Sequence, residues 1–121
     1  MAYIDGFVAP VLPGKRDAYA EMAREASKIF LEHGAIQVVE ALSDDVPHGK
    51  VTDFYRAVAA EENEAIAFSW IVWPSKQVRD EANQKMRNDP RMQMTPDMPF
   101  DGKRMIFGGF EVLLDTGDMR A

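Results

Sequence analysis

The chain carries one arrangement of elements twice, and this repeat limits its possible folds more than any other feature. In the first half, a strand-like stretch at residues 4–9 is followed by Pro-Gly-Lys at 13–15, a helical pattern and a second strand. In the second half, the strand-like stretch Ala65–Trp73 is followed by Pro-Ser-Lys at 74–76, a helical pattern and a last strand. Two successive β-α-β units predict an α+β, ferredoxin-like fold, in which a four-stranded antiparallel sheet carries both helices on one face.

The first helix has the clearest pattern. Between residues 15 and 32, apolar side chains recur at helical spacing and form one stripe: Tyr19, Met22, Ala23, Ala26, Ile29 and Phe30. The second predicted helix, residues 75–88, has a thinner stripe made of Val78, Ala82 and Met86. We expect the remaining strands at residues 35–42 and 105–114. We also expect the first strand to end before Pro10, because proline has no N–H to donate to a central ladder.

Two connecting segments have no single interpretation. Residues 52–59 fit a short helix capped by Thr52, but Phe54 and Tyr55 also favour a strand, so both readings stay open. Residues 89–104 contain three prolines, which exclude a continuous helix, and three methionines between 92 and 98. Methionine side chains adapt to irregular surfaces, so this segment either contacts a ligand or a partner or fills gaps in the core.

Length and charge exclude several classes of protein. The chain is long enough for one domain, and we expect a single domain at 1–115 and a disordered tail at 116–121. The formal net charge of −6 argues against a nucleic-acid partner, because polyanion binding depends on lysine and arginine. The longest apolar stretch, Ala65–Trp73, is far shorter than the ~20 residues that cross a bilayer, so we predict no membrane partner. The first residues lack the basic and apolar regions of an export signal, which leaves the cytoplasm as the expected location.

No sequence motif identifies a cofactor or a metal site. The chain has no cysteine, which excludes disulfides, thiolate nucleophiles and iron–sulfur clusters. The acidic loop with Asp44, Asp45 and His48 lacks a recognised metal-ligand spacing. Gly108 and Gly109 lie inside a predicted strand, where they indicate a bulge or a close backbone approach rather than a dinucleotide motif. We therefore predict no cofactor and no metal.

A four-stranded sheet with both helices on one face leaves its other face uncovered. The predicted strands are rich in isoleucine, phenylalanine, valine and tryptophan on both faces. An uncovered face of this composition forms an apolar patch too large for a soluble monomer. Pairing two identical sheets removes the patch, so we predict an isologous homodimer.

Six runs between residues 3 and 115 carry a more specific signal. The runs are DDVP at 44–47, GKVTDF at 49–54, FSWI at 68–71, PSK at 74–76, NDPRM at 88–92 and MPFDGKRMI at 98–106. Together, and in this order, they resemble the YbaA-like family of small bacterial proteins. The resemblance implies a dimeric α+β barrel, in which two ferredoxin-like subunits close their sheets around a shared interior. It implies no activity, because the family has no established one.

Strand alternation divides the sheet residues into two sets, because successive side chains point to opposite faces. We expect one set to pack under the helices: Ile4, Gly6, Val8, Ile36, Val38, Ile66, Phe68, Trp70, Val72, Ile106, Gly108, Phe110 and Val112. We expect the other set to face the barrel interior: Tyr3, Asp5, Phe7, Ala35, Gln37, Val39, Ala67, Ser69, Ile71, Trp73, Phe107, Gly109, Glu111 and Leu113. Each strand gives one polar residue to this second set. The set therefore predicts a ligand pocket formed by Asp5, Gln37, Ser69, Trp73, Phe107 and Glu111.

Asp5 and Glu111 lie on strands that are neighbours in this fold. Two carboxylates in a desolvated space raise the pKa of one of them, which suits it to act as a base. The competing interpretation is that both are satisfied structurally, by backbone amides, by Lys103 or Arg104, or by the partner subunit. Two function classes follow. One is a homodimer that binds a small apolar or aromatic ligand, either as a binder or as a cofactor-independent enzyme on an aromatic or quinone-like compound. The other is a non-catalytic interaction module with a filled interior.

Overall fold

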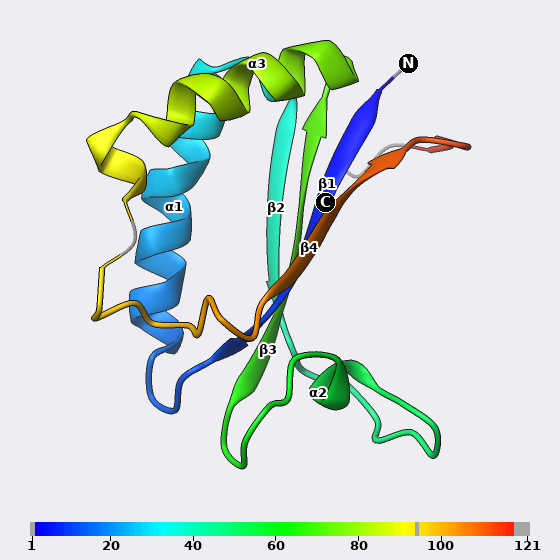
Figure 1. Cartoon of the computed structure of the whole chain (residues 1–121). Coiled ribbons are helices and arrows are strands. Elements are labelled where there is room, and N and C mark those ends of the chain that lie inside the picture. The colour runs from blue at the N-terminus through cyan, green and yellow to red at the C-terminus, as the bar shows by residue number, and fades with distance from the viewer. Residues whose placement is uncertain (1, 94, 118–121) are drawn as a thin grey trace.

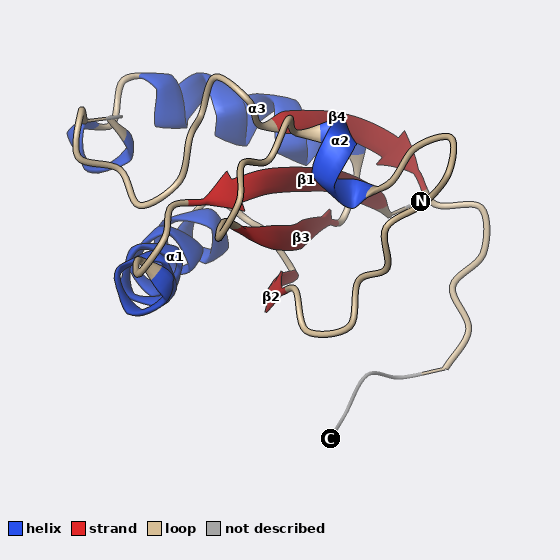
Figure 2. Cartoon of the chain, turned by 90° about the horizontal axis from the view of Figure 1, so that it is seen from below, coloured by secondary structure: helices blue, strands red, loops and turns tan. Residues whose placement is uncertain are grey.

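The structure is a computed structural model that describes residues 2–93 and 95–117, and it confirms the predicted α+β architecture (Figure 1). Strands β1 (Tyr3–Val11), β2 (Gln37–Leu42), β3 (Ala65–Trp73) and β4 (Ile106–Glu111) form one antiparallel sheet. Their order across the sheet is β2-β3-β1-β4, as the view in Figure 2 also shows. Most of the tail predicted to be disordered, 116–121, lies outside the described residues.

Helices α1 (Arg16–Glu32) and α3 (Lys76–Arg87) lie on one side of the sheet, and the short α2 (Phe54–Ala57) lies at the lower end of its other side (Figure 1). The Ser75 hydroxyl begins α3 by accepting a hydrogen bond from the backbone N–H of Val78 at 3.2 Å. The segment at 52–59 is a helix rather than a strand, but Thr52 is not its cap. The Asp53 carboxylate caps it instead, by accepting from the backbone N–H of Arg56 at 2.8 Å.

Strand β1 continues through Pro10 to Val11, so the prediction that it ends before the proline is wrong. The pairing with β4 ends at Val8, whereas the pairing with β3 continues to Val11. The Pro10 carbonyl accepts a bond from the backbone N–H of Asp101, on the β4 side of the strand. In an extended strand the N–H and C=O of one residue point the same way. The missing N–H of Pro10 therefore faces a position where the β4 ladder has already ended, and no ladder bond is lost.

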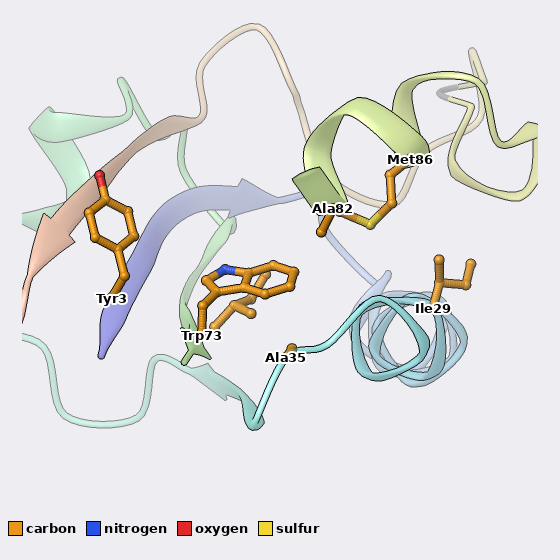
Figure 3. Packing of buried hydrophobic residues seen from close by; sticks show 7 residues of the cluster. Tyr3, Ile29, Ala35, Trp73, Ala82 and Met86 are labelled. Carbon is orange, nitrogen blue, oxygen red and sulfur yellow. The ribbon is translucent and has the colours of Figure 1, made fainter. Parts of the chain in front are cut away.

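For β1, β3 and β4 the prediction of which set of residues packs under the helices is also wrong, because the two faces are exchanged. For β2 it is correct, because Val38 lies on the face that the helices cover, and Gln37 and Val39 lie on the other face. Tyr3, Ile71 and Trp73 are buried in a core cluster with Ile29 of α1 and with Ala82 and Met86 of α3, as Figure 3 shows. The opposite face carries no helix over most of its area (Figure 1). We call these the helix face and the bare face. Both are apolar, so alternation separates the two sets without indicating which set the helices cover.

The bare face consists of side chains that the strand pairing places together. They are Ile4, Gly6, Val8, Gln37, Val39, Ala41, Phe68, Trp70, Val72, Ile106, Gly108 and Phe110. None of them is charged. Phe68, Ile106 and Phe110 are exposed, and Phe54 of α2 packs edge-on against Phe68 at this end of the sheet.

Asp5 anchors α3 to the helix face. Its carboxylate accepts one hydrogen bond from the Trp73 indole N–H at 3.0 Å and another from the Arg79 guanidinium at 2.8 Å. The Arg79 guanidinium also lies over the Tyr3 ring, 5.1 Å from its centre. A side chain at Gly109, opposite Asp5 on β4, would collide with Tyr3 and Arg79, which confirms the close approach expected at this glycine. The structural interpretation of Asp5 is therefore correct, although its partner is Arg79.

Replacing Asp5 with Asn would leave a largely buried guanidinium without its counter-charge. We expect a loss of about 3 kcal/mol in the free energy of unfolding, near the lower end for a broken buried ion pair, because 19% of the Arg79 side chain is exposed. Asp80→Asn removes the exposed partner of the same arginine, and we expect it to cost less than about 1 kcal/mol. Urea unfolding measures both. Equal losses in the two variants would contradict the anchoring role of Asp5.

Candidate functional site

A cavity of about 510 Å³ lies on the helix face, between the sheet, α1 and the irregular segment that follows α3. Its apolar wall includes Phe7, Ala26, Ile29, Phe30, Ala67, Ile71 and Phe100, together with Met22, Met92, Met98 and Met105. We call it the helix-side cavity. Its volume falls within the range of roughly 300–1,000 Å³ that is typical of small-ligand sites. Met92 and Met98 of the segment 89–104 line this cavity, and Met92 also packs against the core cluster, so both interpretations of the segment stay open.

Three polar side chains from three elements meet at the wall of this cavity. Tyr19 comes from the buried stripe of α1, Glu40 from the edge strand β2, and Ser69 from the central strand β3. Glu40 and Ser69 are paired opposite each other, so their side chains share the helix face. The Tyr19 hydroxyl donates a hydrogen bond to Glu40 Oε1 at 2.6 Å. Tyr19 and Ser69 are buried.

The environment of this group disfavours negative charge. Burial raises the pKa of Tyr19 far above its ordinary value, and the Glu40 carboxyl raises it further, so Tyr19 remains a hydrogen-bond donor. Burial also raises the pKa of Glu40, against the opposing effect of the Tyr19 and Ser69 hydroxyls. Glu40 is an exposed residue, because β2 is an edge strand, and desolvation is nevertheless the largest influence on the pKa of its carboxyl group. Within the described residues, Glu40 forms no ion pair.

An exposed ion-pair group closes the cavity at the C-terminal end of α1. The Arg91 guanidinium binds the carboxylate of Glu32 at 2.9 Å and that of Asp89 at 2.7 Å. These contacts attach the irregular segment to α1. Because Arg91 and Glu32 are each about half exposed, the pair contributes little energy, and this end of the cavity can open at low cost.

The six predicted pocket residues do not form one site. Ser69 lines the helix-side cavity, whereas Asp5 and Trp73 belong to the core. Gln37 lies on the bare face, because it pairs with Val72 and not with a helix-face residue. Phe107 is 71% exposed and stacks on Phe7, with ring centres 6.3 Å apart.

Asp5 and Glu111 share a face on neighbouring strands, as expected, but they are not opposite each other. Asp5 pairs with Gly109, and Glu111 pairs with Tyr3. Glu111 is exposed, whereas the carboxylate of Asp5 is occupied by Arg79. The structure therefore gives no support to a catalytic pair made of these two carboxylates.

Tyr19 and Glu40 were not predicted as site residues. In the sequence Tyr19 is one member of an apolar helical stripe, and the hydroxyl at the end of its ring is its only polar side-chain group. For Glu40 the sequence contains a signal that could have indicated a site. Glu40 shares one face of its strand with Val38 and Leu42, and an acidic residue between two apolar residues on the same face is unusual.

The acidic loop before α2 is used structurally. Asp53 accepts hydrogen bonds from the backbone N–H groups of Gly49 and Arg56, and His48 stacks on Tyr55. Within residues 2–93 and 95–117, no group of three or more histidine or acidic side chains is arranged to hold a metal ion. No helix in the same part of the chain has the length and hydrophobicity needed to cross a bilayer.

Solved structures with the same fold include two proteins of low sequence identity. A NIPSNAP family protein from Agrobacterium tumefaciens matches with a TM-score of 0.56 and 14% identity, over 99% of this chain and 100% of that one. A putative antibiotic biosynthesis monooxygenase from Bacillus cereus matches with a TM-score of 0.55 and 13% identity, over 100% of both chains. At these identities the similarity extends to the fold alone.

Sequence comparison gives a closer relationship. The uncharacterized protein YbaA of Escherichia coli is 60% identical over 116 residues, which cover 95% of this chain and 99% of that protein. The protein of the same description from Shigella flexneri matches equally well. Residues 2–102 match the family described as "Protein of unknown function (DUF1428)". The chain therefore belongs to the DUF1428 family, with YbaA among its relatives, and this membership assigns no activity.

Proposed function

We propose that this protein binds a small, largely apolar molecule in the helix-side cavity of each subunit. The observation that carries the proposal is the largely apolar cavity itself, at whose wall the Tyr19 hydroxyl and the Glu40 carboxylate form a hydrogen bond. An apolar cavity with a few convergent polar groups is typical of a small-ligand site.

The walls of the cavity favour an aromatic or otherwise flat ligand. Phe7, Phe30 and Phe100 offer ring surfaces, and the methionine side chains adapt to different shapes. A binder and a cofactor-independent enzyme acting on an aromatic or quinone-like compound both fit this description. The cytoplasm remains the proposed location.

We further propose that the bare face is covered by a second copy of the chain. A monomer of 13.6 kDa is expected to expose about 6,600 Å². The isolated subunit exposes 8586 Å², which is about 2,000 Å² more. A typical interface buries roughly 800 Å² per partner. An uncharged apolar face and a surplus of exposed surface support a homodimer of the α+β barrel type.

The cavity proposal is tested with N-phenyl-1-naphthylamine, an uncharged fluorescent probe of apolar sites. We expect saturable binding of one probe per subunit to the unmodified protein. Ala26→Phe places a ring in the cavity. The ring occupies space that the probe needs, so we expect the variant to bind the probe at least about tenfold more weakly. Ala18→Phe, on the exposed side of the same helix, is the matched control and should bind normally. Absence of saturable binding would refute the cavity proposal and favour the alternative, a non-catalytic interaction module.

The dimer proposal is tested by a charge on the bare face. Phe110 is 62% exposed in the subunit, so Phe110→Asp should leave the fold intact and convert the dimer to a monomer. Leu31→Asp introduces the same charge at an exposed apolar position of α1, and it should remain dimeric. Sedimentation equilibrium reports the mass of each variant. A monomeric unmodified protein, or a dimer that persists in Phe110→Asp, would refute the use of this face.

A further inference from the structure

The polar group in the helix-side cavity leaves part of its hydrogen-bonding capacity unused. The Tyr19 hydroxyl occupies Glu40 Oε1. Across the described part of the chain, Ser69 is the only other donor that interacts with this carboxylate. A carboxylate has about four lone-pair positions, so at least one acceptor position of Glu40 remains free. Glu40 lines both the helix-side cavity and the outer groove beside it, so its carboxylate is within reach of a ligand in the cavity.

We infer that Glu40, held by Tyr19, selects uncharged aromatic ligands that carry a hydroxyl or N–H donor, such as phenols. This inference rests on the proposed small-molecule function and specifies its ligand class. A neutral donor supplies the missing hydrogen bond without bringing a second charge into an apolar space. An anionic ligand is repelled by Glu40, and an ether of the same shape leaves the acceptor unsatisfied.

A cationic ligand fits the cavity less well. The hydroxyls of Tyr19 and Ser69 already stabilise the Glu40 carboxylate, so a cationic ligand gains less binding free energy from pairing with it. The other charged groups of the lining, Glu25, Lys28, Glu32 and Arg91, are more than half exposed. Most of the remaining wall consists of aliphatic, aromatic and thioether groups that cannot replace the hydration of an ammonium ion. A phenol loses far less hydration on entering the same space.

The experiment compares four naphthalene compounds by isothermal titration calorimetry at neutral pH: 1-naphthol, 1-methoxynaphthalene, 1-naphthoate and 1-naphthylmethylammonium. We expect the unmodified protein to bind 1-naphthol about tenfold or more tightly than the ether, as a hydrogen bond to a charged acceptor allows. The carboxylate compound should bind weakest. Equal binding of 1-naphthol and the ether, or tighter binding of the ammonium compound, would overturn the inference.

Two variants locate the selectivity. Glu40→Gln removes the charge with little change of shape, and we expect it to reduce the preference for 1-naphthol to less than about threefold while leaving ether binding unchanged. Glu25→Gln alters an exposed carboxylate at the rim of the same cavity and should keep the full preference. A full preference in Glu40→Gln would overturn the inference. If that variant fails to fold, the comparison of 1-naphthol with the ether in the unmodified protein still tests the inference.

Failure of the two proposals gives different results. If none of the four compounds binds the unmodified protein more tightly than the Ala26→Phe variant, the cavity is not a ligand site, and both proposals fall. If the compounds bind in the cavity without regard to their polar group, the proposed function stands and only the selectivity by Glu40 is refuted.

The pH dependence provides an independent readout. The groups that face Glu40 are Tyr19 of α1 and Ser69 of β3, and Arg16 and Arg24 of α1 lie along the outer groove beside it. Burial raises the pKa of Glu40, and as the pH falls through this raised pKa the carboxylate gains a proton. The preference for 1-naphthol over the ether should therefore decline at acidic pH in the unmodified protein. A preference that stays constant across the titration of Glu40 would contradict the inference.

Discussion

The carboxylate of Asp5 determines how the rest of the structure is arranged. It joins β1 to Trp73 of β3 and to Arg79 of α3, and so fixes α3 on the sheet with a charge-assisted, bidentate contact. The apolar stripe of α3 is thin, with Ala82 and Met86 as its buried members, so packing alone holds this helix weakly. The position of α3 in turn sets where the following segment begins. That segment closes the helix-side cavity, so the site depends on Asp5 without containing it.

The two faces of the sheet have different roles in this account. The helix face combines a core around Trp73 with a cavity whose polar group is Tyr19, Glu40 and Ser69. The bare face has no charged residue and contains a second hollow of about 500 Å³, above Gly6 and Gly108. The ring of Phe110 lies over both glycines. A second copy of the chain seated on this face would enclose the hollow, while each subunit would keep its own cavity.

The β-α-β repeat was sufficient to predict the fold, because helical and strand periodicities differ clearly and the order of elements restricts the topology. The faces were exchanged for a physical reason. Both sets of alternating residues are largely apolar, and Asp5, the charged residue of β1 on the helix face, is satisfied by an arginine that lies 74 positions later in the sequence. Gln37 lies away from the helices, as predicted, but on the face opposite to Asp5 and Ser69, because the register of β2 depends on its pairing with β3, which alternation within one strand does not reveal. The Tyr19–Glu40 contact joins a helix to an edge strand, and local pattern contains no information about such contacts.

The most direct test of the central claim, that ligand binds on the helix face, is an NMR titration with N-phenyl-1-naphthylamine. The protein is labelled at methionine methyl groups and at tryptophan indoles. The account predicts shifts for Met22, Met92, Met98 and Met105, which line the helix-side cavity, and little change for the Trp70 indole on the bare face. The opposite result, in which Trp70 shifts and the four methionines do not, would place the ligand in the hollow of the bare face and contradict the account.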